Sequence, residues 1–270
     1  MKTRVVKVAI MMAVLLAASL AVFAQVGVSN LPDTDEQRIS DMIMAYKVCV
    51  NEGILDSYGH ISVRSKTNPN HFYMPKAMPP ALVTRADIVE LDLNSNPIDP
   101  KAPRTNGERY IHGEIYKTRP DVNSVIHAHL QAVIPFGLAG VVMHPVVAQA
   151  GFLLPNTPLF DSRDWQPASL DSRGMLVRTA PLGAGLAKVL GKSPVVLMRG
   201  HGMTVVADTA RRAAFQAVYT KINADMQFAA MLLNKNVNAM DAQELKYNPT
   251  ENFDVERPWD NFVSRVQGKR

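Results

Sequence analysis

Two histidines stand two residues apart in the apolar stretch VNSVIHAHL, residues 122–130. Side chains at positions i and i+2 of a β-strand point to the same side, so His127 and His129 would have their Cβ atoms roughly 6–7 Å apart. Two neutral imidazoles at that separation can bind one metal ion. The competing interpretation is a pair of strand histidines satisfied by hydrogen bonds, and the pair alone leaves both interpretations open.

A third histidine favours the metal site. His201 lies between two glycines in LMRGHGMTVV, where two apolar segments meet at a turn. Glycine permits unusual backbone angles and close approach of the backbone. The alternative is a turn histidine exposed to water, but the apolar residues on both sides of the turn indicate the edge of a core sheet.

A carboxylate precedes the histidine pair. Glu108 and His112 are four residues apart in NGERYIHGEIY, which predicts a helix over residues 106–117 with both side chains on one face. Glu108, in its first turn, would face the metal pair. Alternatively, it is a surface glutamate favoured by the helix dipole. His112 is expected to pack in the core or to support a ligand.

Several other chemistries find no support in the sequence. It has no G-x-S-x-G elbow, no Walker A loop and no H-E-x-x-H. The segment PLGAGLAKVL contains G-x-G without a third glycine, and it predicts the start of a helix. No Lys/Arg stripe with interleaved aromatic residues is present, so we expect no nucleic-acid partner.

Helical and strand periodicities alternate along the chain, which predicts an α/β or α+β domain. A Thr84–Asp87 capping pattern and a Thr209 N-cap mark two helix starts. Helices are expected over residues 33–52, 106–117, 181–192 and 209–233, with a short one or a turn over 132–140. Strands are expected over residues 60–65, 71–74, 122–130, on both sides of the 199–202 turn, late in 81–93, and with breaks over 141–154.

The first 24 residues have the pattern of a secretory signal peptide. Three basic residues precede an uncharged apolar run, and small residues precede Gln25. The run is shorter than the roughly 20 residues of a membrane-spanning helix, so we expect cleavage, no lasting membrane anchor, and a periplasmic or secreted protein. Cleavage leaves 26 basic and 24 acidic residues, and the net charge falls from +5 to +2.

The remaining residues, 25–270, are expected to form one domain with a polar C-terminal tail from about residue 234. The chain of 270 residues is 47% hydrophobic, enough for a single sizeable core. Cys49 is the only cysteine, which excludes an internal disulfide and fits a buried thiol.

Three segments, in order, resemble the class II aldolase/adducin-domain family: GILDSYGHISVR, GERYIHGEIYKTRPDVNSVIHAHL and LMRGHGMTVV. The similarity runs from about residue 35 to 233. It implies a three-layer α/β/α fold with a central mixed or mostly antiparallel sheet, usually as a homotetramer with the site at a subunit boundary. It also implies one divalent metal ion (Zn, Mn or Co) on His127, His129 and His201, with Glu108 as the acid/base carboxylate.

The chain departs from the family's sugar-phosphate aldolases at three substrate-binding elements. Gly59-His60 stands where they have Gly-Asn, and MPKAMPP, with Lys76, stands where they have a Thr/Ser-Gly phosphate loop. Asn106-Gly107 replaces Ser-Ser before the glutamate. All three elements cradle a phosphate in those aldolases, so we expect a substrate without one.

Other segments, such as FDSRD and MRGHG, are more similar to the decarboxylase-like branch, which includes hydroxypyridine-dicarboxylate decarboxylases. That similarity makes His60 and Arg163 candidates for holding a substrate carboxylate, for which arginine offers two parallel donors. It also suggests Tyr219 as a residue that enters the site of a neighbouring subunit.

We therefore expect a metal-dependent carbon–carbon lyase, a decarboxylase or aldolase, acting on a non-phosphorylated hydroxy- or oxo-carboxylate through a metal-stabilised enolate. Glu108 would shuttle the proton, an effect worth roughly 10²–10⁴-fold. An isomerase, dehydratase or oxygenase on the same metal site is an alternative. A non-catalytic binding module like the adducin head is another, but such a module would have no reason to keep Glu108 and the three histidines together.

Overall fold

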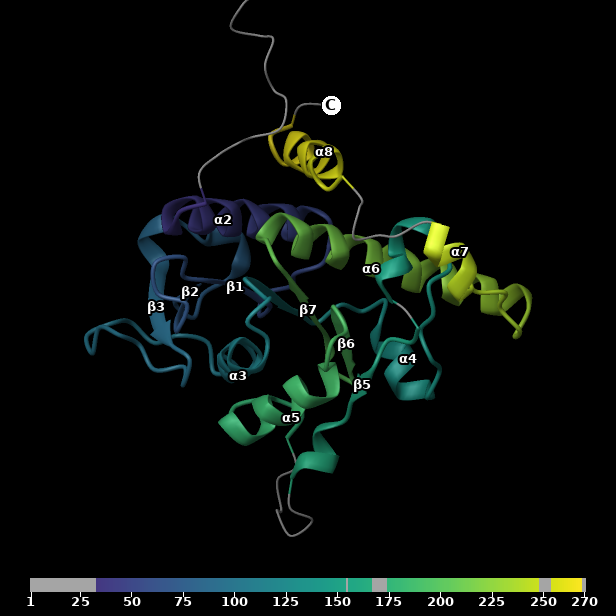
Figure 1. Ribbon diagram of the computed structural model, residues 1–270, viewed down its shortest axis with the longest axis horizontal. Coiled ribbons are helices and arrows are strands. Elements are labelled where there is room, and N and C mark those ends of the chain that lie inside the picture. The colour runs from purple at the N-terminus through teal and green to yellow at the C-terminus, as the bar shows by residue number, and fades with distance from the viewer. Residues whose placement is uncertain (1–32, 154, 167–173, 248–253, 269–270) are drawn as a thin grey trace, which may run out of the picture. The chain divides into compact units, whose positions relative to one another are not determined.

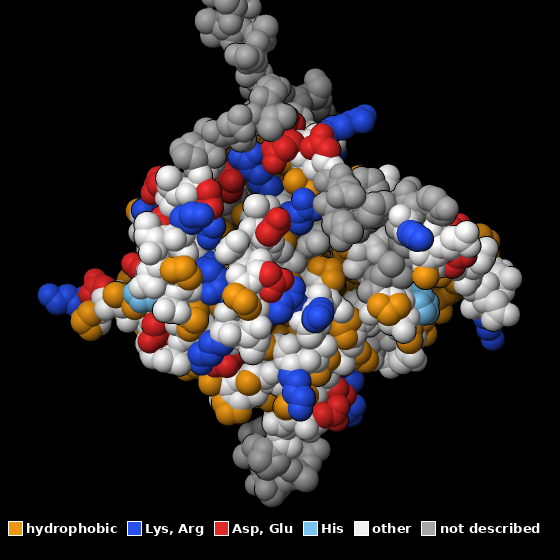
Figure 2. Space-filling view, viewed as in Figure 1, with side chains coloured by type: hydrophobic (Ala, Val, Ile, Leu, Met, Phe, Trp, Pro, Cys, Tyr) orange, Lys and Arg blue, Asp and Glu red, His pale blue; other side chains and the backbone are white. Residues whose placement is uncertain are grey.

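The computed structural model describes residues 33–153, 155–166, 174–247 and 254–268. The expected signal peptide, residues 1–24, lies outside these described residues. None of the described helices combines the length and the apolar character needed to cross a bilayer. On the face drawn in Figure 2, lysine and arginine side chains are interspersed with acidic ones.

A seven-stranded mixed sheet forms the middle layer of the fold (Figure 1). In spatial order its strands are β3 (Ile88–Asp92), β2 (His71–Pro75), β1 (His60–Arg64), β4 (Ser124–Ala128), β7 (Gly202–Ala207), β6 (Val195–Met198) and β5 (Leu159–Phe160). Every neighbouring pair is antiparallel except β5 and β6, which are parallel. The predicted mostly antiparallel sheet is therefore confirmed, and its centre consists of β1, β4 and β7.

Helices cover both faces of this sheet, which confirms the predicted three layers (Figure 1). The helices are α2 (Asp35–Asn51), α3 (Tyr110–Thr118), α4 (Ile134–Ala139), α5 (Ala180–Leu190), α6 (Ala210–Leu233), α7 (Ala242–Tyr247) and α8 (Glu256–Val266). One apolar cluster joins α2 and α6 to one face of the sheet. A second cluster joins α3 and α5 to the opposite face. The alternation of side chains along each strand supplies both clusters at once, because successive residues point to opposite faces.

The predicted helix starts are confirmed at atomic detail. The Thr209 hydroxyl accepts a hydrogen bond from the Arg212 backbone N–H at 3.1 Å at the start of α6. Thr84 and Asp87 form a capping box around the short 3-10 helix η2 (Arg85–Asp87), directly before β3. Each cap satisfies backbone N–H groups that have no partner inside the helix.

The expected strand over residues 141–154 is wrong. The described part of this segment runs alongside α6 and then forms the 3-10 helix η3 (Ala148–Leu153). Two buried amide side chains of α6 make the hydrogen bonds that the backbone of a neighbouring strand would otherwise make. Asn223 accepts from Val146 N at 2.7 Å and donates to His144 O at 2.8 Å, and Gln227 accepts from His144 N at 2.9 Å. Because side chains satisfy its buried backbone, the apolar segment needs no β-ladder.

The segment after residue 234, expected as a polar tail, contains α7 and α8. Helix α8 buries Trp259 and Phe262 against α2 and α6. Arg211 of α6 adds ion pairs to Asp41 of α2 and Glu256 of α8. The polar composition of this segment concealed two aromatic residues three positions apart, which is the spacing of one helical face.

The turn between β6 and β7 packs closely against the end of β4. Gly202 has a φ of 146°, and a Cβ built on it would lie 2.0 Å from the backbone oxygen of Ala128. Only glycine fits there, because real Cβ atoms do not approach backbone that closely and L-residues avoid this φ. The same contact sets His201 beside the histidines at the end of β4.

We predict that Gly202→Ala lowers the free energy of unfolding by more than about 2 kcal/mol, because it adds a backbone clash to an unfavourable φ. Gly140→Ala is the matched control: its φ is +66°, but nothing lies within 4 Å of the added Cβ. That change should cost only about 1 kcal/mol. Chemical denaturation of both variants measures the difference, and equal losses would show that the contact with Ala128 is unimportant.

Candidate metal centre

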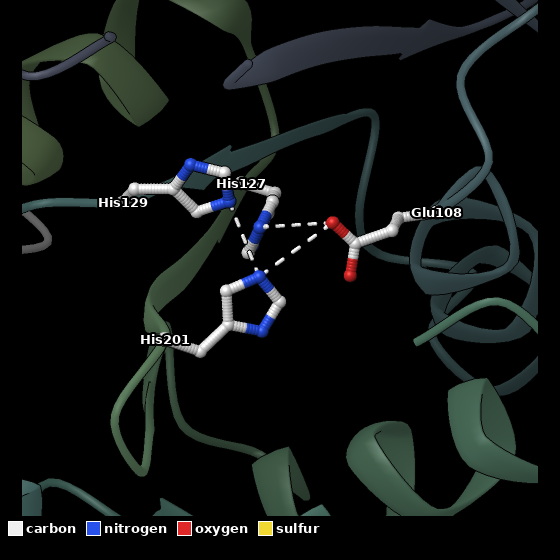
Figure 3. A group of neighbouring side chains, drawn as sticks. All are labelled: Glu108, His127, His129 and His201. Atoms are coloured by element: carbon white, nitrogen blue, oxygen red, sulfur yellow. Dashed lines mark hydrogen bonds and ion pairs between the residues drawn. The ribbon is translucent and has the colours of Figure 1, made fainter. Parts of the chain in front are cut away.

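Four side chains from distant parts of the sequence converge at one end of the central strands (Figure 3). Glu108, His127, His129 and His201, here called the His/Glu cluster, each offer one ligand atom, and these atoms all lie within 4.8 Å of one another. The clustering of three imidazoles and one carboxylate is the arrangement that the sequence predicted. Among the described residues, no other group of three or more His, Cys, Asp or Glu side chains has this geometry.

His127 comes from the centre of the sheet and is fully buried in β4. Its Nδ1 lies 3.1 Å from the backbone oxygen of Met203, which can only accept, so Nδ1 carries the proton. Nε2 therefore has a free lone pair facing the cluster, and no described residue donates to it. Burial holds the pKa of His127 well below its ordinary value, so the ring is neutral and able to bind a cation.

His129 lies just past the end of β4, two residues from His127. Its Nδ1 contacts the Asp56 carboxylate at 3.1 Å, and its Nε2 lies 3.2 Å from Nε2 of His201. A carboxylate that holds the far nitrogen of an imidazole is the usual support of a metal-binding histidine. With Nδ1–H directed to Asp56, the lone pair of Nε2 points into the cluster.

His201 is presented by the turn between β6 and β7. Its Nε2 lies 3.6 Å from Oε2 of Glu108, and its ring centroid lies 4.8 Å from that of His127. The ring is 7% exposed and its Nδ1 has no partner within the described residues. Strands β4 and β7 are neighbours, so this turn reaches the histidine pair directly.

Glu108 lies in a turn before α3, and not in the first turn of the helix as the sequence predicted. The Asn106 side chain accepts a hydrogen bond from the Glu108 backbone N–H at 2.8 Å. The Ile111 backbone N–H donates to the backbone oxygen of Glu108, three residues earlier, as in a turn. These local bonds tighten the chain, so the α-helix begins only at Tyr110. Glu108 and His112 consequently do not share one helical face, yet the turn still aims Glu108 at the histidines.

The carboxylate of Glu108 uses its two oxygens differently. Oε1 accepts a hydrogen bond from Val177 N at 2.7 Å, and Oε2 lies 3.8 Å from Nε2 of His127. Burial alone would raise the pKa of Glu108, but the neighbouring rings of His201, His127 and His60 together lower it. The side chain is thus an anchored carboxylate with one oxygen free for chemistry.

This donor set fits one divalent cation. Three imidazole nitrogens and a carboxylate oxygen surround a common point, and hydrogen bonds to backbone or carboxylate fix two of the imidazoles in the binding tautomer. A buried nitrogen without a partner, such as Nε2 of His127, costs free energy unless a ligand satisfies it. The cluster could therefore hold a metal ion.

The substrate-binding candidates near β1 and β2 differ in their surroundings. His60 begins β1 and is buried, with its ring centroid 5.0 Å from that of His127; Gly59 directly precedes it. Lys76, which follows β2, pairs through Nζ with Asp87 at 2.7 Å. His60 thus lies against the cluster, whereas the charge of Lys76 already has a partner.

The other candidates are Gly107, Arg163 and Tyr219, besides Asn106, which shapes the turn before Glu108. Arg163 is half-exposed and pairs with Asp161, and Tyr219 packs against another α6 ring. Within the described part of the chain, neither residue makes a hydrogen bond, ion pair or ring contact with the His/Glu cluster. Their assigned roles stay predictions.

Sequence reasoning missed two residues beside the cluster. Asp56 supports His129 through its carboxylate. The only sequence signal for Asp56 was its position four residues before His60 in ILDSYGH. Arg178 was hidden in a segment without periodicity. A Cβ built on Gly107 would lie 3.6 Å from Nε of Arg178. The arginine side chain therefore lies against Gly107, the residue that precedes Glu108.

Comparison with known proteins identifies the family of this chain. The model of the Class II Aldolase and Adducin N-terminal domain matches residues 40–228. The decarboxylase tropJ of Talaromyces stipitatus is 36% identical over 191 residues, covering 67% of this chain and 71% of the relative. A 3,4-dihydroxyphthalate decarboxylase of Arthrobacter keyseri is 34% identical over 185 residues, 65% and 71% of the two chains.

Solved structures agree with the fold. An aldolase II superfamily protein from Pseudomonas syringae superposes with a TM-score of 0.71 at 17% identity, covering 88% of this chain and 95% of the other. The chain belongs to the class II aldolase/adducin family, as its sequence predicted. The decarboxylases among its relatives also confirm the expected class of enzyme, a lyase. Rat beta-adducin is more distant, at 22% identity over 233 residues, or 81% of this chain and 30% of that protein.

We predict that the purified protein binds about one divalent ion per chain and that His127→Ala lowers this at least tenfold, because a three-imidazole site loses a buried ligand. His71→Ala is the control, since His71 pairs with Glu90 on β3 and lies outside the cluster. Elemental analysis after dialysis gives the metal content of each variant. Equal metal in both variants, or none in the wild type, would exclude the site.

Proposed function

We propose that the chain is a metal-dependent decarboxylase of a non-phosphorylated aromatic hydroxycarboxylate. The observation that carries this proposal is the position of Oε2 of Glu108, which accepts no hydrogen bond from the described backbone and faces the three imidazoles of the His/Glu cluster. Relatives that are named for removing a carboxylate from 3,4-dihydroxyphthalate support the choice of substrate class. That compound is the first substrate to test.

The residues of the chain can carry the proton through such a reaction. Glu108, as a carboxylate, takes the proton of a substrate hydroxyl on Oε2 while Val177 N–H keeps Oε1 in place. The carbon–carbon bond to the carboxylate then breaks, carbon dioxide leaves, and the electron pair stays on the ring carbon. Glu108 returns the proton to that carbon, and the phenolate oxygen regains a proton from water, so the net change replaces the carboxylate by hydrogen.

A divalent ion held by His127, His129 and His201 would supply a Lewis acid for the charge that develops on the substrate oxygen. Zinc, manganese and cobalt are the ions we propose, because imidazole with a carboxylate suits all three. The chain's own part is to keep His127 neutral by burial and to orient His127 and His129 by their outer hydrogen bonds.

We predict that protein loaded with one of these ions releases carbon dioxide from 3,4-dihydroxyphthalate. Glu108→Gln should lower kcat by roughly 10²–10⁴-fold, because the amide can neither accept nor return the proton. Glu90→Gln, on β3 and paired with His71, should leave kcat unchanged. A protein that releases no carbon dioxide with any of the three ions, or that cleaves L-fuculose 1-phosphate instead, would contradict the decarboxylase proposal.

Arg178 is our candidate for holding the substrate carboxylate. It is exposed, it crosses Gly107, and its neighbour Val177 bonds Glu108. None of the described residues pairs with its guanidinium, whereas Arg163, the arginine that the sequence suggested, already pairs with Asp161.

We predict that Arg178→Ala raises KM for 3,4-dihydroxyphthalate roughly 10- to 100-fold with little change in kcat, as expected for the loss of one charged hydrogen bond used in binding alone. Arg163→Ala should change KM less than about twofold, since its side chain serves Asp161. Steady-state kinetics of both variants decides between the two arginines. The reverse pattern would assign the carboxylate to Arg163.

We also propose that the protein is exported, to the periplasm or the medium, after removal of residues 1–24. The basic start, the short apolar run and the small residues before Gln25 support this. Export agrees with a substrate that lacks phosphate, because phosphorylated sugars are kept inside cells.

Assembly into a homotetramer is our proposal for the quaternary structure. The second half of α6 leaves several large apolar side chains in water, namely Met226, Phe228, Leu232 and Leu233. Phe228 also lines a pocket with His129, so a neighbouring copy that covers this surface would border the cluster. Tyr219, on the same helix, is the residue that we propose at the subunit boundary, as the family resemblance suggests.

A further inference from the structure

Four buried polar side chains form a continuous hydrogen-bonded chain behind the His/Glu cluster. Nδ1 of His60 lies 2.6 Å from Nε2 of His112, and Nδ1 of His112 lies 2.6 Å from Oγ of Ser62. Oγ of Ser62 lies 2.8 Å from the phenol oxygen of Tyr116. We call these four residues the relay; each is at most 3% exposed.

The sequence places the relay residues on two facing elements. His60 and Ser62 alternate with apolar residues along β1, so both point to the face of the sheet that α3 covers. His112 and Tyr116 are four residues apart on α3 and face the strand. His60 is also the direct cross-strand partner of His127, so their rings leave the sheet on the same side.

The inner end of the relay fixes the direction of its protons. Ser62 has one hydroxyl proton and two relay partners, so it donates to one of them and accepts from the other. If Ser62 donated to Tyr116, the buried phenol proton would need another acceptor, and no other acceptor contacts it among the described residues. An unsatisfied buried donor costs about 1–3 kcal/mol, and no ligand reaches this core end of the relay to accept the proton, whereas a ligand of the His/Glu cluster can do so at the His60 end. Tyr116 therefore donates to Ser62, and Ser62 donates to Nδ1 of His112.

The same order continues to the outer end. Because Nδ1 of His112 accepts, its Nε2 carries the proton and donates to Nδ1 of His60. Nδ1 of His60 is then an acceptor, which leaves the proton of His60 on Nε2. That nitrogen is buried and has no partner within the described residues. Burial lowers the pKa of His112 to about 3, so the ring between Ser62 and His60 is neutral at ordinary pH.

We propose that the relay holds His60 as a neutral Nε2–H donor beside the His/Glu cluster, where it binds an oxygen of the substrate. The orphaned nitrogen and the proton order of three supporting residues carry this inference. His60 would be a catalytic residue that stabilises negative charge on the oxygen. His112, Ser62 and Tyr116 would be positioning residues, because they act only through the tautomer of His60. The role of the oxygen rests on the proposed function, whereas the proton order does not.

Preorganisation is the physical advantage of such a donor. A neutral imidazole with a fixed proton costs nothing to orient when charge develops, and a buried site strengthens its hydrogen bond. A free histidine would distribute its proton between both ring nitrogens and would lose part of that effect. Through the relay, the hydroxyl of Tyr116 thus fixes the proton of His60 on Nε2, the nitrogen beside the cluster.

Neutron diffraction of the deuterated wild-type protein tests the proton order directly, whatever the activity. We expect deuterium on Nε2 of His60, on Nε2 of His112 and on Oγ of Ser62, directed at His112. Deuterium on Nδ1 of His60 would overturn the proposal. Because this result needs no substrate, it separates a failure of the relay from a failure of the decarboxylase assignment.

Kinetics with 3,4-dihydroxyphthalate tests the role at the substrate. Ser62→Ala should lower kcat roughly tenfold while KM and bound metal stay unchanged, as for other residues that act through a neighbour. The matched control is Ser124→Ala, an equally buried serine on β4. Among the described residues its hydroxyl bonds only the backbone oxygen of Ser62, and its loss should keep kcat within about twofold. Equal losses in the two variants would reduce the relay to a structural role.

Substitutions of His60 complete the test. His60→Gln, which can place an N–H near the position of Nε2, should retain more kcat than His60→Leu, whose loss should reach roughly 10²–10³-fold. Metal content should match the wild type in both, and loss of metal would instead make His60 a ligand and overturn the proposal. If Ser62→Ala does not fold, Tyr116→Phe removes the hydroxyl that directs the Ser62 proton to His112, and it should lower kcat in the same direction by a smaller factor.

Discussion

The close packing of one glycine turn on the end of one strand determines most of this structure's chemistry. Gly202 lies so near the backbone oxygen of Ala128 that a side chain has no room there. That contact places His201 within 3.2 Å of His129, although the two residues are 72 positions apart in sequence. The sheet then acts as a rigid support, since β4 and β7 are hydrogen-bonded neighbours over five residue pairs. A rigid support matters because a metal site tolerates only small errors in the position of its ligands.

Burial determines how these side chains behave. His127 and His60 on the sheet and His112 on α3 are buried between the layers, where the cost of desolvation disfavours the imidazolium form and lowers their pKa values. Neutral rings can bind a cation or donate a single proton, and outer contacts decide which nitrogen does so. Met203 O and the Asp56 carboxylate accept the Nδ1 protons of His127 and His129, which leaves a lone pair on Nε2 of each ring. His112 instead donates to Nδ1 of His60, which leaves the proton of His60 on Nε2. The same type of side chain therefore serves two different functions within one buried region.

Much of this arrangement could be predicted from the sequence because it depends on local spacing. The i, i+2 spacing of His127 and His129 on an apolar strand, and the glycines on both sides of His201, each carry a geometric meaning. Residues 141–154 could not be predicted, because Asn223 and Gln227 of a distant helix satisfy their backbone. The start of α3 was placed too early because the Asn106 side chain and the Glu108 N–H close a local turn, and the α-helix begins only after it, at Tyr110. Asp56 and Arg178 lie beside the cluster only because of tertiary contacts, and the periodicity of the sequence does not predict such contacts.

The central claim is that three imidazoles hold one ion beside the carboxylate of Glu108. X-ray absorption spectroscopy of the protein loaded with zinc measures this most directly, because it reports the ligands around the metal itself. The account predicts a first shell at about 2.0–2.1 Å with the outer-shell scattering of three imidazole rings. That scattering should fall to two rings in His129→Ala. A shell of oxygen ligands without imidazole scattering would show that the metal binds elsewhere and would contradict the account.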